Sequence, residues 1–422
     1  MLRPLLLQSE IALAWSRSGR WTPLALASAL GDAHVSVKQS LRARHFMYTA
    51  QGRADILRDA ADETQVELLR ASDFFAGLDQ VSPHRYFTSP VEQLDAVAST
   101  QLLEDATGWD CLTCRTAPAG GVRPWLQLWA GTAAACTQAH YDVADNVFVQ
   151  CSGTKEFLLY PPRAAEKMHF YPDAHPRARK AQLCVEHPDL ARHPRAAALP
   201  PPVRVVLEPG DALFLPAFYI HHVTALTPSV SLNVFSESAI KLAAGVPLAL
   251  PPPLHAAWPL ELRRRGLAEL LSQLLHGLGM PPLSAVVADL LASRFAPLDD
   301  CLASHVAPAD GAAGHRRQRR PPQAPSWDEL RPALTAHCEE CLECFAQLRQ
   351  VVHEASHPLR EPVHNHQFEM SPLIRDEAQC DGSEIHYSAV RDLTVAHLIE
   401  LLSVRLFGAV HMQEELKRMI DT

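Results

Sequence analysis

The sequence predicts an α+β protein with a β-rich centre and an all-α C-terminal region. Short runs that alternate between polar and apolar residues, such as SVSLNVF at residues 229–235, recur between residues 125 and 240 and are typical of strands. After residue 240 the apolar residues recur at helical spacing instead, as in ELRRRGLAELLSQLL at residues 261–275. A chain of 422 residues is long enough for two or three domains and a sizeable core.

The composition is that of a globular protein and argues against two classes of partner. Hydrophobic residues make up 47% of the chain and charged residues 20%. The formal net charge of −9 gives no global basic surface for nucleic acid, although a local patch stays open. We expect neither a secretory signal nor a membrane helix, because no apolar run approaches a membrane span. The ten scattered cysteines predict reduced thiols and an intracellular protein, cytoplasmic or nuclear.

Residues 1–124 are predicted to form an α/β layer that packs on the β-rich centre. The patterns indicate strands at residues 3–8 and 34–40, and helices at residues 9–16, 23–30, 64–78 and 90–103. The C-x-x-C at Cys111 and Cys114 has no second such pair at zinc spacing and no thioredoxin-like context. We therefore interpret it as two unpaired thiols.

The residues with the strongest chemical signal lie in two stretches, residues 125–155 and 207–233. His140 and Asp142 are two apart in a β-prone context, and such residues point to the same face of a strand. A second histidine, His221 or His222, lies near the end of the second stretch. Two histidines and one carboxylate are the ligand set of non-haem Fe(II) oxygenases. Each residue taken alone is more typical of a satisfied polar side chain than of a ligand.

At these residues the sequence resembles the JmjC (cupin-8) 2-oxoglutarate-dependent oxygenases, over roughly residues 1–245. It is most similar to the group with the asparaginyl hydroxylase of hypoxia-inducible factor and the tRNA wybutosine hydroxylase. The family motif reads W-x-G, T-x-x-H-x-D, N, G-x-K, P-P, L-x-P-G-D, P, H-x-V and S-x-N. The matching residues are Trp129, Gly131, Thr137, His140, Asp142, Asn146, Gly153, Lys155, Pro161, Pro162, Leu207, Pro209, Gly210, Asp211, Pro216, His221, Val223, Ser231 and Asn233.

The resemblance implies a fold, a set of cofactors and a role for each matching residue. Residues 125–240 would form a double-stranded β-helix, the jelly-roll core of the JmjC and cupin proteins. The protein would bind Fe(II) as its cofactor, 2-oxoglutarate as co-substrate and O2. His140, Asp142 and His221 would bind the iron, with His222 as the adjacent alternative. Thr137 and Lys155 would hold the distal carboxylate of 2-oxoglutarate, and Asn146 and Asn233 would line its pocket.

The resemblance leaves the substrate open. Hydroxylation of a side chain on a protein or peptide, with succinate and CO2 as co-products, is the first expectation. An N-methyl-lysine demethylase and a modified-tRNA hydroxylase use the same chemistry, and the acidic balance of the chain counts against the second. A rival of another class is a non-catalytic JmjC-fold binding module. It is disfavoured because the chain keeps every ligand and the lysine.

An insert between the halves of the site, residues 168–198, is rich in His, Pro and Arg. We interpret it as a long loop near the mouth of the active site, with its four histidines at the surface rather than in a metal tract. Its cations Arg177, Arg179 and Lys180 could touch substrate there. The four histidines are His169, His175, His187 and His193.

The rest of the chain is predicted to be helical on both sides of a disordered linker. Residues 241–304 are predicted to be helical and include a proline-rich linker at 247–253. Residues 305–326 are low in complexity, and residues 327–422 are helical again. Ser326 and Glu329 form a capping box. Cys338, Cys341 and Cys344 resemble part of an iron–sulfur run, but the fourth cysteine is missing and the three fall on roughly one side of a predicted helix. Leucine stripes on the helices predict either intrachain packing or a homodimer. The stripes are Leu267, Leu270, Leu271, Leu274 and Leu275, and Leu398, Leu401, Leu402 and Leu406.

Overall fold

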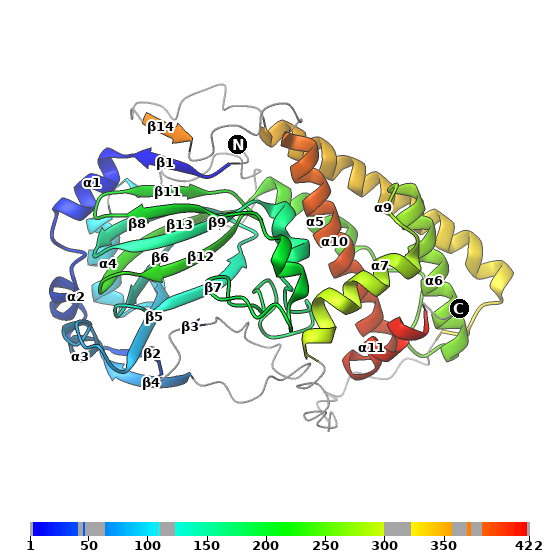
Figure 1. Cartoon of the computed structure of the whole chain (residues 1–422), viewed down its shortest axis with the longest axis horizontal. Helices are drawn as coiled ribbons and strands as arrows, with labels where there is room; N and C mark the ends of the chain where they lie inside the picture. Colours follow the sequence, from blue (N-terminus) through cyan, green and yellow to red (C-terminus); the bar gives the residue numbers. More distant parts are fainter. Residues whose placement is uncertain are drawn as a thin grey trace.

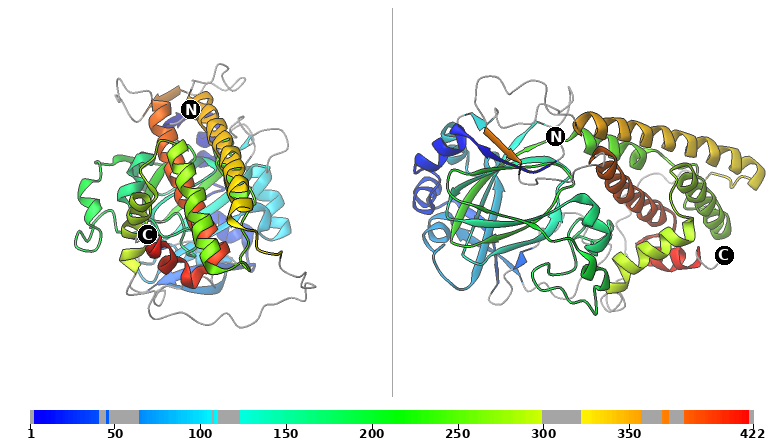
Figure 2. Two further views of the ribbon diagram at one scale, coloured as in Figure 1. Left: turned by 90° about the vertical axis from the view of Figure 1, so that its right-hand side faces the viewer. Right: turned by 45° about the horizontal axis from the view of Figure 1, so that its top comes forward.

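The structure, a computed structural model, describes residues 3–40, 45–46, 64–106, 108–109, 123–298, 322–356, 369–372 and 382–419. A β-rich part occupies one end of the molecule and a group of helices occupies the other (Figure 1). Figure 2 shows the same division from two further sides. The predicted α+β class, with a β core and a helical C-terminal region, is confirmed.

Two sheets form the β-rich part, and they pair their strands almost entirely in antiparallel fashion. In spatial order, the larger sheet contains β14 (Glu369–Pro372), β1 (Leu5–Gln8), β11 (Ala212–Leu215), β8 (Asp145–Ser152), β13 (Ser229–Ser236), β6 (Trp125–Gly131), β5 (His84–Pro90), β2 (His34–Ser40) and β4 (Gln65–Arg70). The smaller sheet contains β10 (Val203–Leu207), β9 (Lys155–Tyr160), β12 (Ile220–Ala225), β7 (Cys136–Tyr141) and β3 (His45–Phe46). The strands of the predicted β-helix therefore alternate between two facing sheets.

Alternation along the strands divides the larger sheet into an apolar face and a more polar face. On β13, Val230, Leu232 and Val234 are buried in a core that also contains the N-terminal helices. Their neighbours Ser231 and Asn233 are buried too, but they lie on the opposite face, between the sheets. The N-terminal helices are α1 (Glu10–Arg17), α2 (Pro23–Leu30), α3 (Ala71–Ala76) and α4 (Ala96–Asp105). Polar side chains of β13 therefore face the interior between the two sheets.

The N-terminal layer differs from the prediction in two segments, of which residues 64–78 are the first. Residues 64–78, expected as a single helix, form strand β4 followed by the short helix α3. β4 pairs with β2 along its full length and lies at the edge of the sheet. Val66 and Leu68 are 69% and 64% exposed there, so the apolar signal in that half of the segment did not come from a buried helical face. Pairing with β2 provides hydrogen bonds for the backbone of β4, and this tertiary contact favours a strand over the predicted helix.

The region from residue 90 to 103 is also less helical than expected, because α4 begins only at Ala96, capped by Asp95. The preceding residues form the end of β5 and a short 3₁₀ turn, η1 (Val91–Gln93). The other 3₁₀ turns are η3 (Pro162–Lys167), η4 (Pro194–Ala198) and η6 (Ala296–Leu298). The Cys111 and Cys114 pair lies outside the described residues.

The C-terminal helices pack on one another and on the flank of the β-rich part in one continuous core. They are α5 (Ala239–Ala249), α6 (Leu260–Gly277), α7 (Leu283–Leu290), the π-helical turn η5 (Leu291–Phe295), α9 (Trp327–Ser356), α10 (Gly382–Phe407) and α11 (Ala409–Arg418). Helix α5 was not predicted, and the expected linker from residue 247 overlaps its end, since Pro247 is accommodated inside it. The capping box of Ser326 and Glu329 is confirmed at the start of α9.

The two leucine stripes serve this intrachain core. Leu267, Leu270, Leu271, Leu274 and Leu275 are all buried within one chain, and so are Leu398, Leu402 and Leu406. Cys338, Cys341 and Cys344 are buried on α9 as free thiols. A homodimer would therefore have to use surfaces other than these stripes, and it stays a prediction.

The C-terminal region also contributes a strand that was not predicted. Residues of β14 pair antiparallel with β1 at the edge of the larger sheet, beside the N-terminal strand in Figure 1. Residues 299–321, which include most of the predicted linker, lie outside the described part. Among the helices that are described, none is long and apolar enough to cross a bilayer alone. The bent pair α10 and α11 passes that test by length and composition, with a 110° bend.

Candidate metal and co-substrate site

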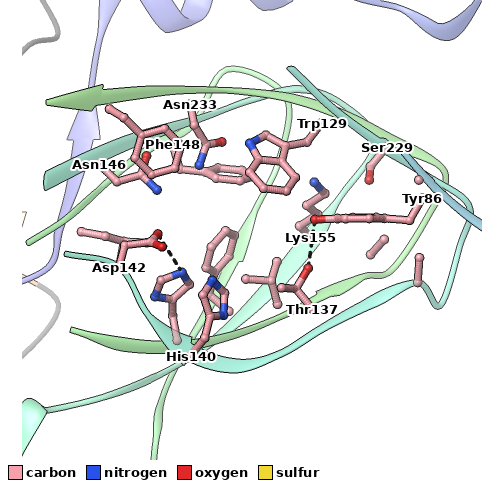
Figure 3. A pocket seen from close by; sticks show the side chains of 18 residues that line it. Tyr86, Trp129, Thr137, His140, Asp142, Asn146, Phe148, Lys155, Ser229 and Asn233 are labelled. Carbon is pink, nitrogen blue, oxygen red and sulfur yellow. Dashed lines mark hydrogen bonds and ion pairs between the residues drawn. The ribbon is translucent and has the colours of Figure 1, made fainter. Parts of the chain in front are cut away.

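A cavity of about 80 Å³ lies between the two sheets, and the predicted site residues line it (Figure 3). His140 and Asp142 lie at one side, and Thr137 and Lys155 at another. His221 also lines the cavity and groups with His140 and Asp142. The full lining is Tyr86, Trp129, Gly131, Ala135, Thr137, His140, Asp142, Asn146, Phe148, Lys155, Phe157, Leu215, His221, Val223, Ala225, Ser229, Asn233 and Phe235. The structure therefore brings all seven predicted site residues to one cavity.

His140, Asp142 and His221 converge on one point. One ligand atom from each lies within 4.8 Å of the others, a spacing that a single metal ion can bridge. Nε2 of His221 lies 3.7 Å from Oδ2 of Asp142, and the two imidazole rings are 4.2 Å apart between centroids. Asp142 follows the end of β7, and its side chain is 28% exposed. Three protein ligands on one side leave the other coordination positions open.

Each histidine is held in the orientation that a ligand needs. Nδ1 of His140 lies 2.8 Å from the carbonyl oxygen of Gln138, and Nδ1 of His221 lies 3.1 Å from that of Tyr219. A carbonyl accepts only from an N–H, so each ring carries its proton on Nδ1 and keeps a lone pair on Nε2. Burial, and then the neighbouring His221, hold the pKa of His140 well below its usual range, which keeps that ring neutral.

A β-bulge in β7 places Thr137 on the same cavity as His140. Residues three apart on a regular strand point to opposite faces. Here His140 pairs with His221 and Thr137 pairs with Val223, so three steps on β7 match two on β12. The extra residue reverses the alternation between the two positions. The bulge therefore unites the ligand set with the predicted co-substrate residues.

The register of β12 separates the two adjacent histidines. His221 pairs with His140 and faces the cavity, whereas His222 points to the other face. There its Nε2 lies 3.2 Å from the sulfur of Cys136 and 3.8 Å from a carboxylate oxygen of Glu186. His222 is completely buried in that environment. Of the two alternatives, His221 is the one that can reach the metal position.

Lys155 extends into the cavity from the first position of β9 and is only 5% exposed. Its Nζ donates to the hydroxyl of Ser231 at 2.7 Å and lies 5.1 Å from the ring centre of Phe148. Burial lowers the pKa of Lys155 to about 7. The turn before Lys155 requires glycine at position 153. Gly153 has φ of 71°, and the Cβ of any other residue there would clash with the carbonyl oxygen of Pro228.

Thr137 is oriented by a residue that the sequence analysis did not identify. Its hydroxyl lies 3.0 Å from the phenol oxygen of Tyr86, and Figure 3 shows this pair close to Lys155. Burial raises the pKa of Tyr86, so the phenol keeps its proton. Tyr86 comes from β5, and no local pattern marks it. Ser231, by contrast, is already among the matching motif residues, and its position two residues before Asn233 on an alternating strand places both side chains on one face.

The Cupin-like domain family matches residues 3–241, more than half of the chain. The chain belongs to this family. It is 36% identical to tRNA wybutosine-synthesizing protein 5 of Danio rerio over 112 residues, 26% of this chain and 30% of the relative. It is 34% identical to the same protein of Homo sapiens over 113 residues, 26% and 31% of the two chains. It is 29% identical to Lysine-specific demethylase JMJ31 of Arabidopsis thaliana over 114 residues, 27% and 21%.

The matched stretches span about a third or less of these relatives. The predicted membership of the JmjC group of cupin-like proteins is confirmed. The JmjC-type enzymes among the relatives support an oxygenase in general, whereas the substrate that each name gives belongs to that relative.

The cavity of this cupin-like domain has the polar groups that a charged co-substrate needs. Among the described residues, Oδ1 of Asn146, Oδ1 of Asn233 and Nε1 of Trp129 are buried without a hydrogen-bond partner. A buried polar group without a partner is unfavourable by about 1–3 kcal/mol. These atoms, the ammonium of Lys155 and the hydroxyl of Thr137 surround one space (Figure 3). The two amide oxygens are acceptors, whereas the indole N–H, the ammonium and the hydroxyl are donors, and these three donors fit a small dicarboxylate beside a metal bound by two histidines and an aspartate.

The insert of the cupin-like domain differs from the prediction of a surface loop. His169, His175 and His193 are buried, and only His187 is exposed. The cause is the C-terminal helices, because Arg294 of η5 reaches into the insert. It binds Asp173 at 2.9 Å and Glu400 of α10 at 2.9 Å, and all three side chains are buried. The helical region thus fixes the insert, which in turn pairs with β7 beside His140.

Proposed function

We propose that the protein is an Fe(II)- and 2-oxoglutarate-dependent oxygenase that hydroxylates a side chain of a protein. One observation carries the proposal: the candidate ligands His140, Asp142 and His221 share a single cavity with a buried lysine. A structural metal site has no need of a cationic pocket beside it. An oxygenase of this class needs both, because the co-substrate must chelate the metal and be held at its far end.

One set of residues would bind the metal and another would bind the co-substrate. His140, Asp142 and His221 would hold the Fe(II), with Nδ1 of each imidazole turned toward a backbone carbonyl. Lys155 and the Tyr86–Thr137 pair would grip the distal carboxylate of 2-oxoglutarate, and the amides of Asn146 and Asn233 would contact its other polar atoms. When bound, iron, 2-oxoglutarate and O2 supply the oxidation, with succinate and CO2 as co-products.

The residues of the chain contribute orientation and exclusion of water. Phe148, Phe157, Leu215 and Val223 line the cavity between the polar groups and leave little room for solvent. Low local polarity strengthens the contact between Lys155 and a carboxylate. Protein hydroxylation is our first choice of reaction because the acidic chain has no global basic surface. A modified-tRNA hydroxylase is the second candidate, supported by the relatives named for wybutosine synthesis. N-methyl-lysine demethylation, by the same chemistry, is supported by JMJ31.

The test is formation of succinate from 2-oxoglutarate by purified protein with Fe(II), alone and with pools of peptides or bulk tRNA. We expect succinate in all reactions of the wild type and more in the presence of the right substrate class. Asp142→Ala should remove both the bound iron and the succinate, whereas Asp189→Ala, on the exposed part of the insert, should change neither. Iron binding without any succinate formation would favour the rival, a JmjC-fold binding module.

Two further expectations belong to the proposal. A reducing compartment, the cytoplasm or the nucleus, suits a protein whose Cys151, Cys338 and Cys341 are free thiols. A homodimer would form through the outer faces of the C-terminal helices, and light scattering on the full chain would test for it.

A further inference from the structure

A groove lies between helices α7 and α10, where the helical end of the molecule meets the β-rich part (Figure 1). This α7–α10 groove has a volume of about 620 Å³ and is also lined by the turns η3 and η5 and by Phe170. Residues on its rim, such as Pro281 and Ala285, are exposed, so the groove opens to solvent. No described residue lines both this groove and the candidate metal site.

One face of α10 forms the longer wall of the α7–α10 groove. Ile385, Ala389, Leu393 and Ala396 line it at steps of four, four and three residues, so they form an apolar stripe along one side of the helix. At a rise of about 1.5 Å per residue, the stripe is about 16 Å long, or three helical turns. Val286 of α7 lines the opposite wall. The groove therefore has the length and the apolar walls to hold a short segment of a partner.

The walls favour a helix over an extended chain. None of the described residues that line the groove belongs to a strand of the two sheets, so an extended backbone would find no strand edge to pair with. Its N–H and C=O groups would lie against apolar side chains without partners, which is unfavourable. A helix satisfies its own backbone and can place one apolar face in such a groove.

An acidic side chain lines each of the three walls. Glu166 belongs to η3, Asp289 to α7 and Asp392 to α10, and each side chain is more than half exposed. Each carboxylate also has a cationic partner at 2.7 or 2.8 Å, and these partners do not line the groove; they are Lys167, Arg195 and Arg391. Exposed pairs of this kind are weak, and a carboxylate has lone pairs for a second donor. The three carboxylates can therefore accept from a ligand as well.

Glu166 and Asp392 lie close enough to influence each other across the groove. Partial burial raises the pKa of Asp392, its neighbour Arg391 lowers it, and the negative charge of Glu166 raises it again. A cation placed between these two carboxylates would relieve their repulsion. The position suits the ammonium or guanidinium group of a bound helix.

The cations that line the groove do not reverse its acidic character. Arg294 is bound by two buried carboxylates, and Arg163 lies exposed on the rim. The charge of the groove therefore favours a basic partner and disfavours the phosphates of a nucleic acid.

We propose that the α7–α10 groove is a docking site for a basic amphipathic helix of a partner protein. The apolar face of that helix packs on the stripe of α10, and its lysine or arginine side chains pair with Glu166, Asp289 and Asp392. The inference goes beyond the proposed function and does not depend on it.

The docked helix lies next to the metal site without entering it. Phe170, which lines the groove, packs edge-to-face on Tyr141, with 5.1 Å between the ring centroids. Tyr141 follows His140 on β7, and adjacent residues of a strand point to opposite faces. The partner would therefore be held on the outer side of β7, opposite the cavity that contains the candidate ligands.

The experiment measures binding of two labelled model peptides to the full chain by fluorescence anisotropy. Both peptides have about 14 residues with leucine at steps of three and four; one has lysine at the other positions and the second has glutamate. The wild type should bind the Leu/Lys peptide at least about 10-fold more tightly than the Leu/Glu peptide.

A matched pair of substitutions on α7 tests whether the peptide occupies the groove. Ala285 and Ala288 are both exposed on this helix, but only Ala285 lines the groove. Ala285→Arg places a long cation on the rim and should weaken binding of the Leu/Lys peptide at least about 10-fold. Ala288→Arg should change it less than about twofold. Both variants should keep the melting transition of the wild type, because neither position is buried.

A second set of variants tests the charges. The double variant Glu166→Gln/Asp392→Asn should weaken binding of the Leu/Lys peptide about 3- to 10-fold and make it less sensitive to salt. Glu414→Gln is the control, because Glu414 is also more than half exposed, pairs with a neighbour on its own helix and does not line the groove. It should change the affinity less than about twofold.

Four outcomes would overturn the inference. The first two are equal binding of both peptides by the wild type and equal effects of Ala285→Arg and Ala288→Arg. The third is a dimer, seen by light scattering, that Ala285→Arg abolishes and Ala288→Arg retains, since the occupant would then be a second copy of the chain. The fourth is tighter binding of a synthetic peptide of residues 305–322, which contains four arginines and no leucine, because a segment of this chain would then be the occupant.

Discussion

The contact between Lys155 and the co-substrate gives the sharpest test of the site, through Lys155→Met. Methionine keeps an unbranched side chain of similar length in the cavity and removes the charge. The lost interaction is a charge-assisted hydrogen bond, worth about 1.5–3 kcal/mol. We therefore expect the dissociation constant for 2-oxoglutarate to rise about 10- to 100-fold. Metal affinity should stay unchanged, because Lys155 is not among the three candidate ligands.

The low pKa of Lys155 adds a pH dependence with a definite sign. Burial lowers this pKa to about 7 in the empty cavity, so above pH 7 the amine is mostly neutral there. A bound carboxylate favours the charged form and raises the pKa in the complex. Binding above pH 7 must then take up a proton. The affinity is highest below pH 7 and falls about tenfold for each pH unit above it, up to the pKa of the complex.

Calorimetric titration with 2-oxoglutarate and Mn(II), in two buffers of different ionisation enthalpy, measures both quantities. At pH 8 the wild type should take up about one proton, and Lys155→Met should take up none and show a flat pH profile. Lys167→Met should keep the wild-type slope. Loss of fold does not explain the result, since removing a buried amine should leave the free energy of unfolding unchanged or higher. Unchanged affinity in Lys155→Met, or no proton uptake by the wild type, would place the co-substrate elsewhere.

Three other predictions follow from the geometry. His221→Ala should abolish iron binding, measured by metal analysis of purified protein, and His222→Ala should retain it; loss in both would mean that the site responds to packing rather than ligation. Tyr86→Phe should raise the 2-oxoglutarate concentration needed for half-maximal succinate formation about two- to tenfold, which corresponds to the loss of one neutral hydrogen bond. An unchanged concentration would show that the phenol of Tyr86 does not help to bind 2-oxoglutarate. Arg294→Leu should lower the free energy of unfolding by about 3–5 kcal/mol in urea titrations, because it leaves the carboxylate of Glu400 buried without its cation. A change below about 1 kcal/mol would contradict that role.

The sequence alone determined the features that depend on local periodicity and on spacing along one strand. His140 and Asp142 share a face because two residues make one period of a strand. The leucines of α6 fall on one side because of the helical period, and the polar residues of β13 fall opposite its valines for the same reason as His140 and Asp142. These relations need no partner element, so they can be read before any fold is known.

The tertiary structure decided every relation that depends on a partner strand or on a distant element. The bulge between Thr137 and His140 arises from pairing with β12, and it reverses the face that spacing alone would assign to Thr137. Tyr86 reaches Thr137 only because β5 pairs with β6 in one register. The insert with three of its four histidines is buried against helices that follow it by a hundred residues or more, through Arg294 and its partners. Register and packing are set by contacts between segments far apart in the chain, and no local pattern contains that information.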